Sequence, residues 1–507
     1  DWSTRWQFAN WTAEKQMLGP TTGPQPFLPE LFPHWGGTGW NYSVEVGIPS
    51  GGLRPTAVAL SGDTEEDWVD DSAWIWTRST GVDELRPAVA LGRWYTLINP
   101  SSDESPSVRV NLFSNTSQYL PQFGPEVRRV VAYLDRFLPA YPVSEVDVYQ
   151  GSSVLPAEAR VSGFRRTHPG MVGVERVKAN TVGAGSEFEK QDPHMAQTMI
   201  ARQVVHQYWG QQLAPATERD AWIGVALSDA YAAFYVRSAF GNDAYETRMT
   251  GLRTAIEDPR EYRSNQDTLN RSQRPLSLTG ATRYTDVSSK LRGDYGAYLM
   301  ADMIRLRIGD YAYFHALDRL ARRIGSVPGS RLTTDDLQAA FEEASGQDLS
   351  DFFDYWVHGG FLPSVTARIS RVEGEASGLV GCIETNVPFG RMDIPVEVVD
   401  QGGERSVAAL VDVIDGEGAF WIPDRAEDAE VNLDPMGLSV AYERTVKWEK
   451  KPSCSRPDVA SEEVLQEQAE VEGVDEPGEE TPATPTVPPV ETPAENVSPS
   501  PVKSPEP

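Results

Sequence analysis

The spacing of hydrophobic residues changes its period along the chain. Between residues 37 and 125, short runs alternate apolar and polar positions and are separated by Gly, Pro, Asn and Asp, which is typical of antiparallel strands. Between 126 and 362, longer runs place apolar residues three and four positions apart, as on one face of a helix. Alternation returns between 363 and 447. The pattern predicts a multidomain α+β protein with an N-terminal antiparallel β-domain, a central α+β domain and a C-terminal β-sandwich.

The central segment contains the clearest individual elements. Short strand-like runs at 143–150 and 171–177 come before or between the helical runs, so a small sheet followed by a helical half is expected. Capping-type Thr and Asp residues open one helical run and Gly346 closes it, which is a normal helix boundary. The runs with helical spacing are 125–138, 195–213, 221–240, 295–309 and 333–346.

Both ends of the chain differ from its body. Residues 1–36 form an arm rich in Trp and Pro, in which Trp2 and Trp6 would share one helical face. We expect this arm either to pack on the body as a strap or to dock at a membrane interface or a complex, because Trp favours membrane–water boundaries. Residues 448–507 form an acidic, Pro-rich tail, and 458–507 contain 13 acidic residues and one lysine. Such a tail buries too little apolar surface to offset its ordering entropy, so it is expected to be disordered.

Charge and cysteine usage narrow the class of protein. The 507 residues contain 45 Lys and Arg against 74 Asp and Glu, a net charge of −29 that argues against a nucleic-acid partner. No apolar run approaches the roughly 18 residues of a membrane-spanning helix. The two cysteines, Cys382 and Cys454, are too few for a cysteine-based zinc site. The sequence leaves two alternatives, a disulfide between them or two free thiols. The chain begins at Asp1, so we expect a mature, exported protein of the periplasm, cell surface or exterior, unless this boundary is arbitrary.

One stretch decides the functional interpretation. His206 opens the sequence H-Q-Y-W-G, and D-A-W follows at 220–222. This region resembles the zinc site of the aminopeptidase N and leukotriene hydrolase family of gluzincin metallopeptidases. In that family one helix carries H-E-x-x-H, and a W-x-x-E segment on the next helix supplies the third zinc ligand. Imidazoles four residues apart lie on one helical face and converge on one metal ion.

The resemblance continues beyond this stretch. Residues 292–319 are similar to the family's Y-x-K-G-A segment and the helix that follows it, and residues 335–369 are similar to the end of its catalytic domain. A P-G-M sequence at 169–171 is similar to the end of the family's exopeptidase motif. The resemblance spans roughly 37–447, and it implies a thermolysin-like domain over 126–362 between the two β-domains.

The same resemblance implies that the catalytic chemistry is lost. The first zinc-binding His falls on Arg202, the catalytic Glu on Gln203, the second His on His206 and the third-ligand Glu on Val225. We call these four residues the zinc-equivalent positions. A permanent cation, an amide that takes no proton from water and an isopropyl group replace three of the groups the reaction needs. No bound metal or other cofactor is therefore expected.

Further residues follow from the resemblance. The tyrosine that stabilises the oxyanion falls on Gly293, although Tyr295 lies only two positions away. The aromatic residues of this region are expected mainly to pack in the core, and some of them to line a former substrate cleft. Those assigned to the cleft are Tyr208, Trp209, Trp222 and Tyr295. Such a cleft would bind an extended chain by backbone pairing, and Arg202 would favour an acidic group or carboxylate there.

Three functional hypotheses remain. The first is an inactive, aminopeptidase-like pseudoenzyme that binds a protein or peptide partner or acts as a scaffold of the cell envelope or exterior. The second is an active hydrolase with a rebuilt or displaced metal site, for which His206, Asp229 and His194 are the available groups. The third is a structural subunit of an envelope or surface assembly that docks through its N-terminal arm.

Overall fold

The computed structural model describes residues within 25–454, all of which belong to one compact unit of the chain. Several short loops and the longer segments 1–24, 27–39, 151–169, 175–193, 258–293 and 455–507 lie outside the described residues. The predictions for the Trp-rich arm, apart from residues 25 and 26, and for nearly all of the acidic tail therefore fall outside them. None of the described helices is long and apolar enough to cross a membrane.

The N-terminal segment forms short antiparallel strands, as its alternating pattern predicts. One sheet has the order β2-β5-β4 and another the order β1-β6-β3, and all of these pairings are antiparallel. The strands are β1 (Gln25–Pro26), β2 (Trp40–Pro49), β3 (Ala57–Leu60), β4 (Asp63–Val69), β5 (Trp74–Glu84) and β6 (Ala88–Gly92).

A mixed sheet crosses the boundary expected at residue 125. Strands β7 (Trp94–Asn99) and β8 (Ser107–Phe113) pair antiparallel, but β8 then pairs parallel with β9 (Glu145–Gln150), and β9 pairs parallel with β10 (Met171–Val174). The order is β10-β9-β8-β7. Two strands that were expected in the N-terminal β-domain therefore belong to the sheet of the central domain. The antiparallel hairpin has the same alternation in sequence as the strands before it, so periodicity does not reveal the change of sheet.

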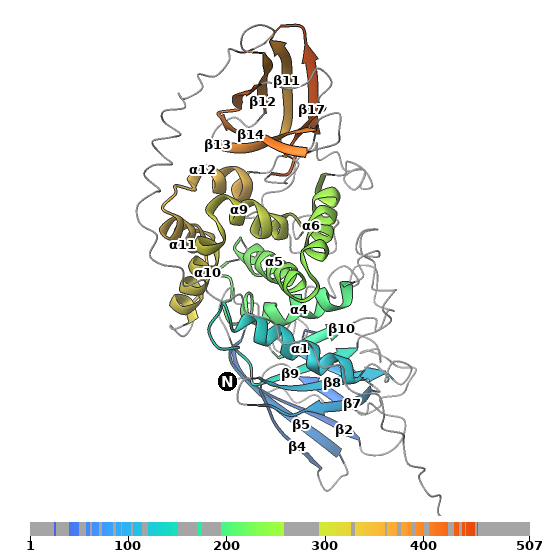
Figure 1. Ribbon diagram of the computed structural model, residues 1–507. Helices are drawn as coiled ribbons and strands as arrows, with labels where there is room; N and C mark the ends of the chain where they lie inside the picture. The colour runs from blue at the N-terminus through green and yellow to red at the C-terminus, as the bar shows by residue number, and fades with distance from the viewer. Residues whose placement is uncertain are drawn as a thin grey trace, which may run out of the picture. The chain divides into compact units, whose positions relative to one another are not determined.

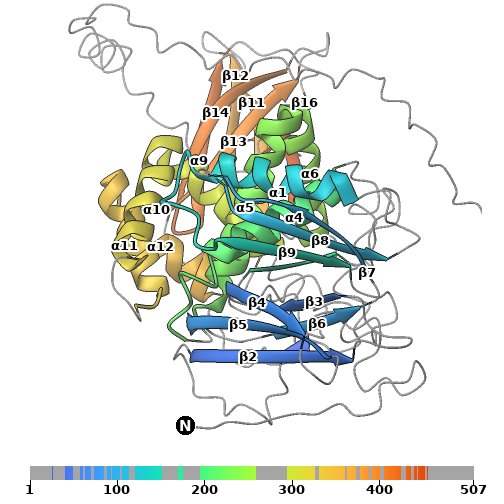
Figure 2. The ribbon, with the colours of Figure 1, turned by 90° about the horizontal axis from the view of Figure 1, so that it is seen from below.

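Helices pack against this sheet and against one another. Helices α1 (Leu120–Leu134) and α4 (Met195–Tyr208) lie beside the β7–β10 sheet, and α5 (Ala221–Phe240) packs on α4 (Figures 1 and 2). The expected helix at 221–240 is confirmed over its full length. Further helical segments are α6 (Asn242–Glu257), the π-helical turn η3 (Leu299–Met303), α9 (Ile304–Ile308), α10 (Asp310–Gly325), α11 (Thr334–Ser345), α12 (Ser350–Phe353) and the π-helical turn η4 (Asp354–His358).

Local chemistry explains where helix α11 begins and ends. The Thr333 side chain accepts a hydrogen bond from the backbone N–H of Asp336, and the Asp336 side chain accepts one from the N–H of Thr333, which is a capping box. At the other end, Gly346 has a φ of +69°, a left-handed conformation that glycine adopts without strain. The boundaries expected for this helix are confirmed.

The C-terminal segment forms seven strands in one hydrogen-bonded order, in which β14 and β15 are joined by a single residue pair, Ile414 with Glu417. Its order is β16-β13-β14-β15-β12-β11-β17, with β11 and β17 parallel. A turn at Asp415 and Gly416, with φ of +50° and +91°, folds β14 back into β15. The strands are β11 (Ser364–Val372), β12 (Gly378–Thr385), β13 (Arg391–Val399), β14 (Arg405–Ile414), β15 (Glu417–Pro423), β16 (Glu430–Leu433) and β17 (Glu443–Glu449).

A disulfide and a group of ion pairs stabilise the C-terminal segment. Cys382 on β12 and Cys454, which follows β17, form a disulfide with a Cα–Cα distance of 5.8 Å. The pairing that the sequence left open is therefore present. Helix α6 is joined to this segment by partly buried charges, since Arg444 binds both Glu257 at 2.9 Å and Asp434 at 3.1 Å.

Candidate functional site

Helix α4 carries three of the zinc-equivalent positions, and they point in two directions. Gln203 faces strand β10, the edge of the mixed sheet, because its side chain bonds to that strand. Arg202 faces α5, because its guanidinium binds Asp229 on that helix. Neighbouring residues of a helix are separated by about 100° around its axis, so one short sequence serves two neighbours.

Two glutamines on α4 occupy the outer edge of β10. Gln203 accepts a hydrogen bond from the N–H of Gly173 at 2.7 Å and donates one to the carbonyl of the same residue at 2.6 Å. One helical turn later, Gln207 accepts from the N–H of Gly170 at 2.8 Å and donates to the carbonyl of Met171 at 3.1 Å. These amides bond to the strand as the backbone of a neighbouring strand would. The expectation that an extended peptide pairs with the backbone of this cleft is therefore not met at Gly170, Met171 or Gly173, whose outward groups are already bonded.

A buried ion pair lies where the resemblance places metal ligands. The Arg202 Nε is 2.9 Å from Asp229 Oδ1, and the Arg248 Nη2 on α6 is 3.8 Å from the same oxygen. The side chain of Asp229 is 4% exposed and that of Arg202 is 16% exposed. Asp229 comes one helical turn after Val225, so the carboxylate that α5 provides is displaced by a turn from the position of the family's third ligand.

His206 is held in a neutral form beside this pair. Burial and the nearby Arg202 guanidinium lower the pKa of His206 from 6.5 to about 4. Its Nδ1 is buried and has no hydrogen-bond partner among the described residues. The ring is in close contact with Gly210, where φ is +119° and a Cβ atom would lie 2.4 Å from the ring. Glycine is therefore required at position 210 both by the backbone conformation and by the imidazole.

Helices α4 and α5 approach closely beside Val225, the fourth zinc-equivalent position. A Cβ atom on Gly224 would lie 2.9 Å from the Cα of Gly210, so α5 touches the turn that ends α4. Val225 follows on α5 and is partly buried. The start of α5 is fixed by Asp220, whose Oδ1 accepts hydrogen bonds from the backbone and hydroxyl of Thr334, and by Trp222, whose indole donates to the same hydroxyl. The D-x-W sequence thus has a structural role in joining α5 to α11.

These residues do not fit a zinc ion. A zinc site of this type needs two imidazoles and a carboxylate around one point, and the zinc-equivalent positions offer one imidazole, one amide already bonded at both ends and one guanidinium. Asp229, the carboxylate of the displaced-site hypothesis, is bound to Arg202. Within the part of the chain that the structure describes, there is no group of three His, Cys, Asp or Glu residues able to hold a metal.

The remaining candidates lie in the core or outside the described residues. Gly293 is among the residues that the structure does not describe. Tyr295 is buried and donates its hydroxyl hydrogen bond to the carbonyl of Trp356 at 2.8 Å, so this phenol is used for packing. Tyr208, Trp209 and Trp222 also belong to the hydrophobic core. The four aromatic residues therefore follow the core-packing alternative rather than the cleft-lining one.

The comparisons with known proteins identify the fold. No family model matches the chain, and no curated protein matches it. Among solved structures, it is similar to the Legionella pneumophila aminopeptidase A, whose crystal structure was determined in complex with aspartic acid, with a TM-score of 0.56 and 14% sequence identity. The match covers 82% of this chain and 45% of that protein, so the chain spans less than half of its length. The fold of this chain is aminopeptidase-like.

Sequence analysis missed two features of the site. Gln207 was recognised only as part of a framework sequence, although its spacing of four from Gln203 places both amides on one helical face. Arg248 was not recognised at all, because it lies on a separate helix and nothing in the local sequence indicates its contact with Asp229. The first feature had a sequence signal and the second had none.

Proposed function

We propose that this chain is a non-catalytic relative of the gluzincin aminopeptidases that acts as a binding or scaffolding protein of the cell envelope or exterior. The observation that carries the proposal is the ion pair of Arg202, one of the zinc-equivalent positions, with Asp229. An arginine remains charged at any physiological pH, and its charge opposes a dication in the same place. The structural comparison supports an aminopeptidase-like fold, and the H-Q-Y-W-G and D-x-W sequences are what favours the gluzincin family within that fold.

The lost catalytic groups support the same proposal. Peptide hydrolysis in this class needs a metal-bound water and a carboxylate base that accepts its proton. Gln203 stands at the position of that base, and its carbonyl oxygen and amino group are both bonded to Gly173. His206 stays neutral at pH 7 because its pKa is lowered to about 4, so it does not act as a proton donor there.

The disulfide supports an exported location. Disulfides persist in oxidising compartments and are rare in the cytosol, where thiols are kept reduced. The Cys382–Cys454 bond therefore fits the expectation that the protein works in the periplasm, at the cell surface or outside the cell.

Zinc content and peptidase activity of the purified full chain test the proposal. The protein is incubated with zinc, freed of excess metal by gel filtration, and measured by mass spectrometry of the metal and by hydrolysis of aminoacyl arylamides. We expect the wild-type chain to retain far less than one zinc per molecule and to show no hydrolysis. Near-stoichiometric zinc, together with hydrolysis that a chelator abolishes, would overturn the proposal in favour of an active hydrolase.

A matched variant controls for the sensitivity of the metal measurement. The triple substitution Arg202→His, Gln203→Glu and Val225→Glu restores the family's residues at the zinc-equivalent positions. We expect this variant to retain zinc where the wild type does not, because two imidazoles and a carboxylate would then face one point. The hypothesis of a structural subunit is tested separately, by comparing the membrane or complex association of the full chain with that of a chain lacking residues 1–36.

A further inference from the structure

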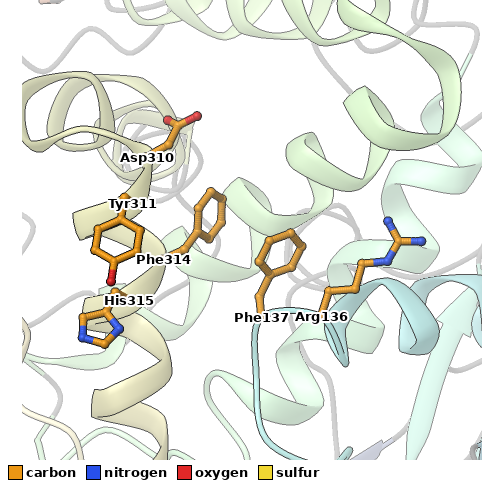
Figure 3. A pocket seen from close by; sticks show the side chains of 6 residues that line it. All are labelled: Arg136, Phe137, Asp310, Tyr311, Phe314 and His315. Carbon is orange, nitrogen blue, oxygen red and sulfur yellow. The ribbon is translucent and has the colours of Figure 1, made fainter. Parts of the chain in front are cut away.

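A pocket lies between the segment that follows α1 and the first turns of α10. The residues that line it are distant in sequence from the zinc-equivalent positions. The pocket is a shallow depression, largely open to solvent, with a volume of about 460 Å³. It is lined by Arg136, Phe137, Asp310, Tyr311, Phe314 and His315. Figure 3 shows Tyr311 and His315 on one side, Phe137 and Phe314 in the middle and Arg136 on the other side.

Aromatic rings form two stacked pairs in this pocket. Tyr311 stacks on His315 with ring centroids 5.6 Å apart and an interplanar angle of 11°. Phe137 stacks on Phe314 with centroids 4.9 Å apart. Tyr311 is 82% exposed, although large aromatic side chains usually bury most of their surface. Tyr311 therefore presents most of an aromatic side chain to solvent, whereas Phe137 and Phe314 are partly buried and pack on each other and on the core.

Buried charges hold one polar group of the pocket in place. Asp310 forms an ion pair with Arg305, whose guanidinium is buried and also binds Asp302 at 3.2 Å. Asp302 in turn accepts a hydrogen bond from the hydroxyl of Tyr245 at 2.5 Å. The Arg305 guanidinium lies 5.6 Å from the centre of the Phe234 ring, which fixes it further. The carboxylate of Asp310 is 61% exposed, so an anchored acceptor faces the pocket.

The charges at the pocket are balanced. Arg136 is exposed and lines the pocket, so its guanidinium supplies hydrogen-bond donors at this side. Asp310 offers acceptors at the other side. A ligand with a net charge would be repelled at one end of the pocket by the group of the same sign. A neutral ligand with hydroxyl groups would use both the donors and the acceptors.

We propose that this pocket binds the neutral pyranose rings of a glycan. One face of a pyranose ring presents C–H groups that pack on an aromatic ring, and the edge of the ring presents hydroxyls that both donate and accept hydrogen bonds. Tyr311 supplies an exposed aromatic surface, Phe137 and Phe314 line the pocket beside it, and Arg136 and Asp310 supply the polar partners. This inference does not depend on the loss of zinc, because none of these residues lies at the zinc-equivalent positions.

Binding of neutral oligosaccharides to the full chain tests the proposal. Maltohexaose, cellohexaose and chitohexaose are titrated in turn by calorimetry, and contacts are recorded by saturation-transfer NMR. We expect at least one of them to bind, and the substitution Tyr311→Ala to weaken its affinity about tenfold or more because the stacking face is lost. Arg136→Ala is expected to weaken it as well, with a loss of enthalpy.

A control variant and two control ligands show whether binding is specific to Tyr311 and to glycans. Tyr95→Ala removes another exposed tyrosine, 59% exposed on β7, and is expected to leave binding unchanged. Circular dichroism verifies that the variants are folded, which is expected because Tyr311 and Arg136 are on the surface. Absence of binding to all three glycans would overturn the proposal. Equal binding by wild type and Tyr311→Ala, or Tyr311-dependent binding of adenosine or triproline but of no glycan, would overturn it too.

Discussion

His206 illustrates how burial and a neighbouring cation together set the charge of a residue. Its pKa is lowered to about 4 by burial and by the Arg202 guanidinium, while an unfolded chain has a histidine pKa of about 6.5. Between these values the unfolded chain binds a proton that the folded chain does not. The stability that comes from neutral His206 is therefore fully present above pH 6.5 and is lost as the pH falls toward 4.

This difference predicts the pH dependence of a single substitution. Between pH 6.5 and 4, the free energy of unfolding of the wild type should fall by about 3 kcal/mol more than that of His206→Asn, which lacks the titrating group. Urea denaturation at a series of pH values measures both. The exposed His315→Asn is the control and should keep the wild-type dependence. Parallel curves for wild type and His206→Asn would show that the imidazole is protonated at its ordinary pKa.

At the scale of single residues, the sequence predicted the chemistry of the site residues better than it predicted their interaction partners. Aligning His206 with the family motif was sufficient to predict that Arg202 and Val225 lack metal-binding chemistry, because side-chain chemistry is a local property. The ion pair of Arg202 with Asp229 depends on how α5 packs on α4, and Arg248 joins it from a third helix. Local sequence does not specify such packing, so these partners came only from the structure.

At the scale of secondary-structure elements, the paired amides of Gln203 and Gln207 join helix α4 to strand β10. Replacing Gln203 with Glu restores the family's residue, but a carboxylate accepts from the N–H of Gly173 and cannot donate to its carbonyl. A buried carbonyl is then left unpaired beside a negative charge. We expect a loss of about 1–3 kcal/mol in the free energy of unfolding, measured by urea denaturation at pH 7. Gln212→Glu, on the exposed turn after α4, is the control and should change stability by less than about 0.5 kcal/mol.

The identity of single elements was predictable, but their assembly into sheets was not. Capping residues and periodic apolar positions gave α5 and α11 correctly, since these signals lie within the helix itself. The pairing of β8 with β9 joins residues separated by α1, and the pairing of β11 with β17 joins residues about 80 positions apart. Strand alternation specifies which face is buried and does not specify the neighbouring strand.

At the scale of the whole molecule, the disulfide closes the C-terminal segment on itself. Cys382 lies in a central strand, and Cys454 lies 72 residues later, just after β17. Between them are five of the seven strands of the sheet, so opening the bond frees a long loop in the unfolded chain. The order of this sheet brings the first and last of its strands in sequence, β11 and β17, side by side, and the bond secures that arrangement.

Removal of the disulfide should therefore destabilise the protein measurably. For a loop of this length the chain-entropy model gives about 4 kcal/mol, which is expected for Cys382→Ser with Cys454→Ser relative to the oxidised wild type. The wild type treated with dithiothreitol should approach the double variant, and the double variant itself should not respond to the reductant. Thermal and urea denaturation with and without reductant measure the difference. Equal stability of the oxidised and reduced wild type would show that the bond is not needed to hold the sheet.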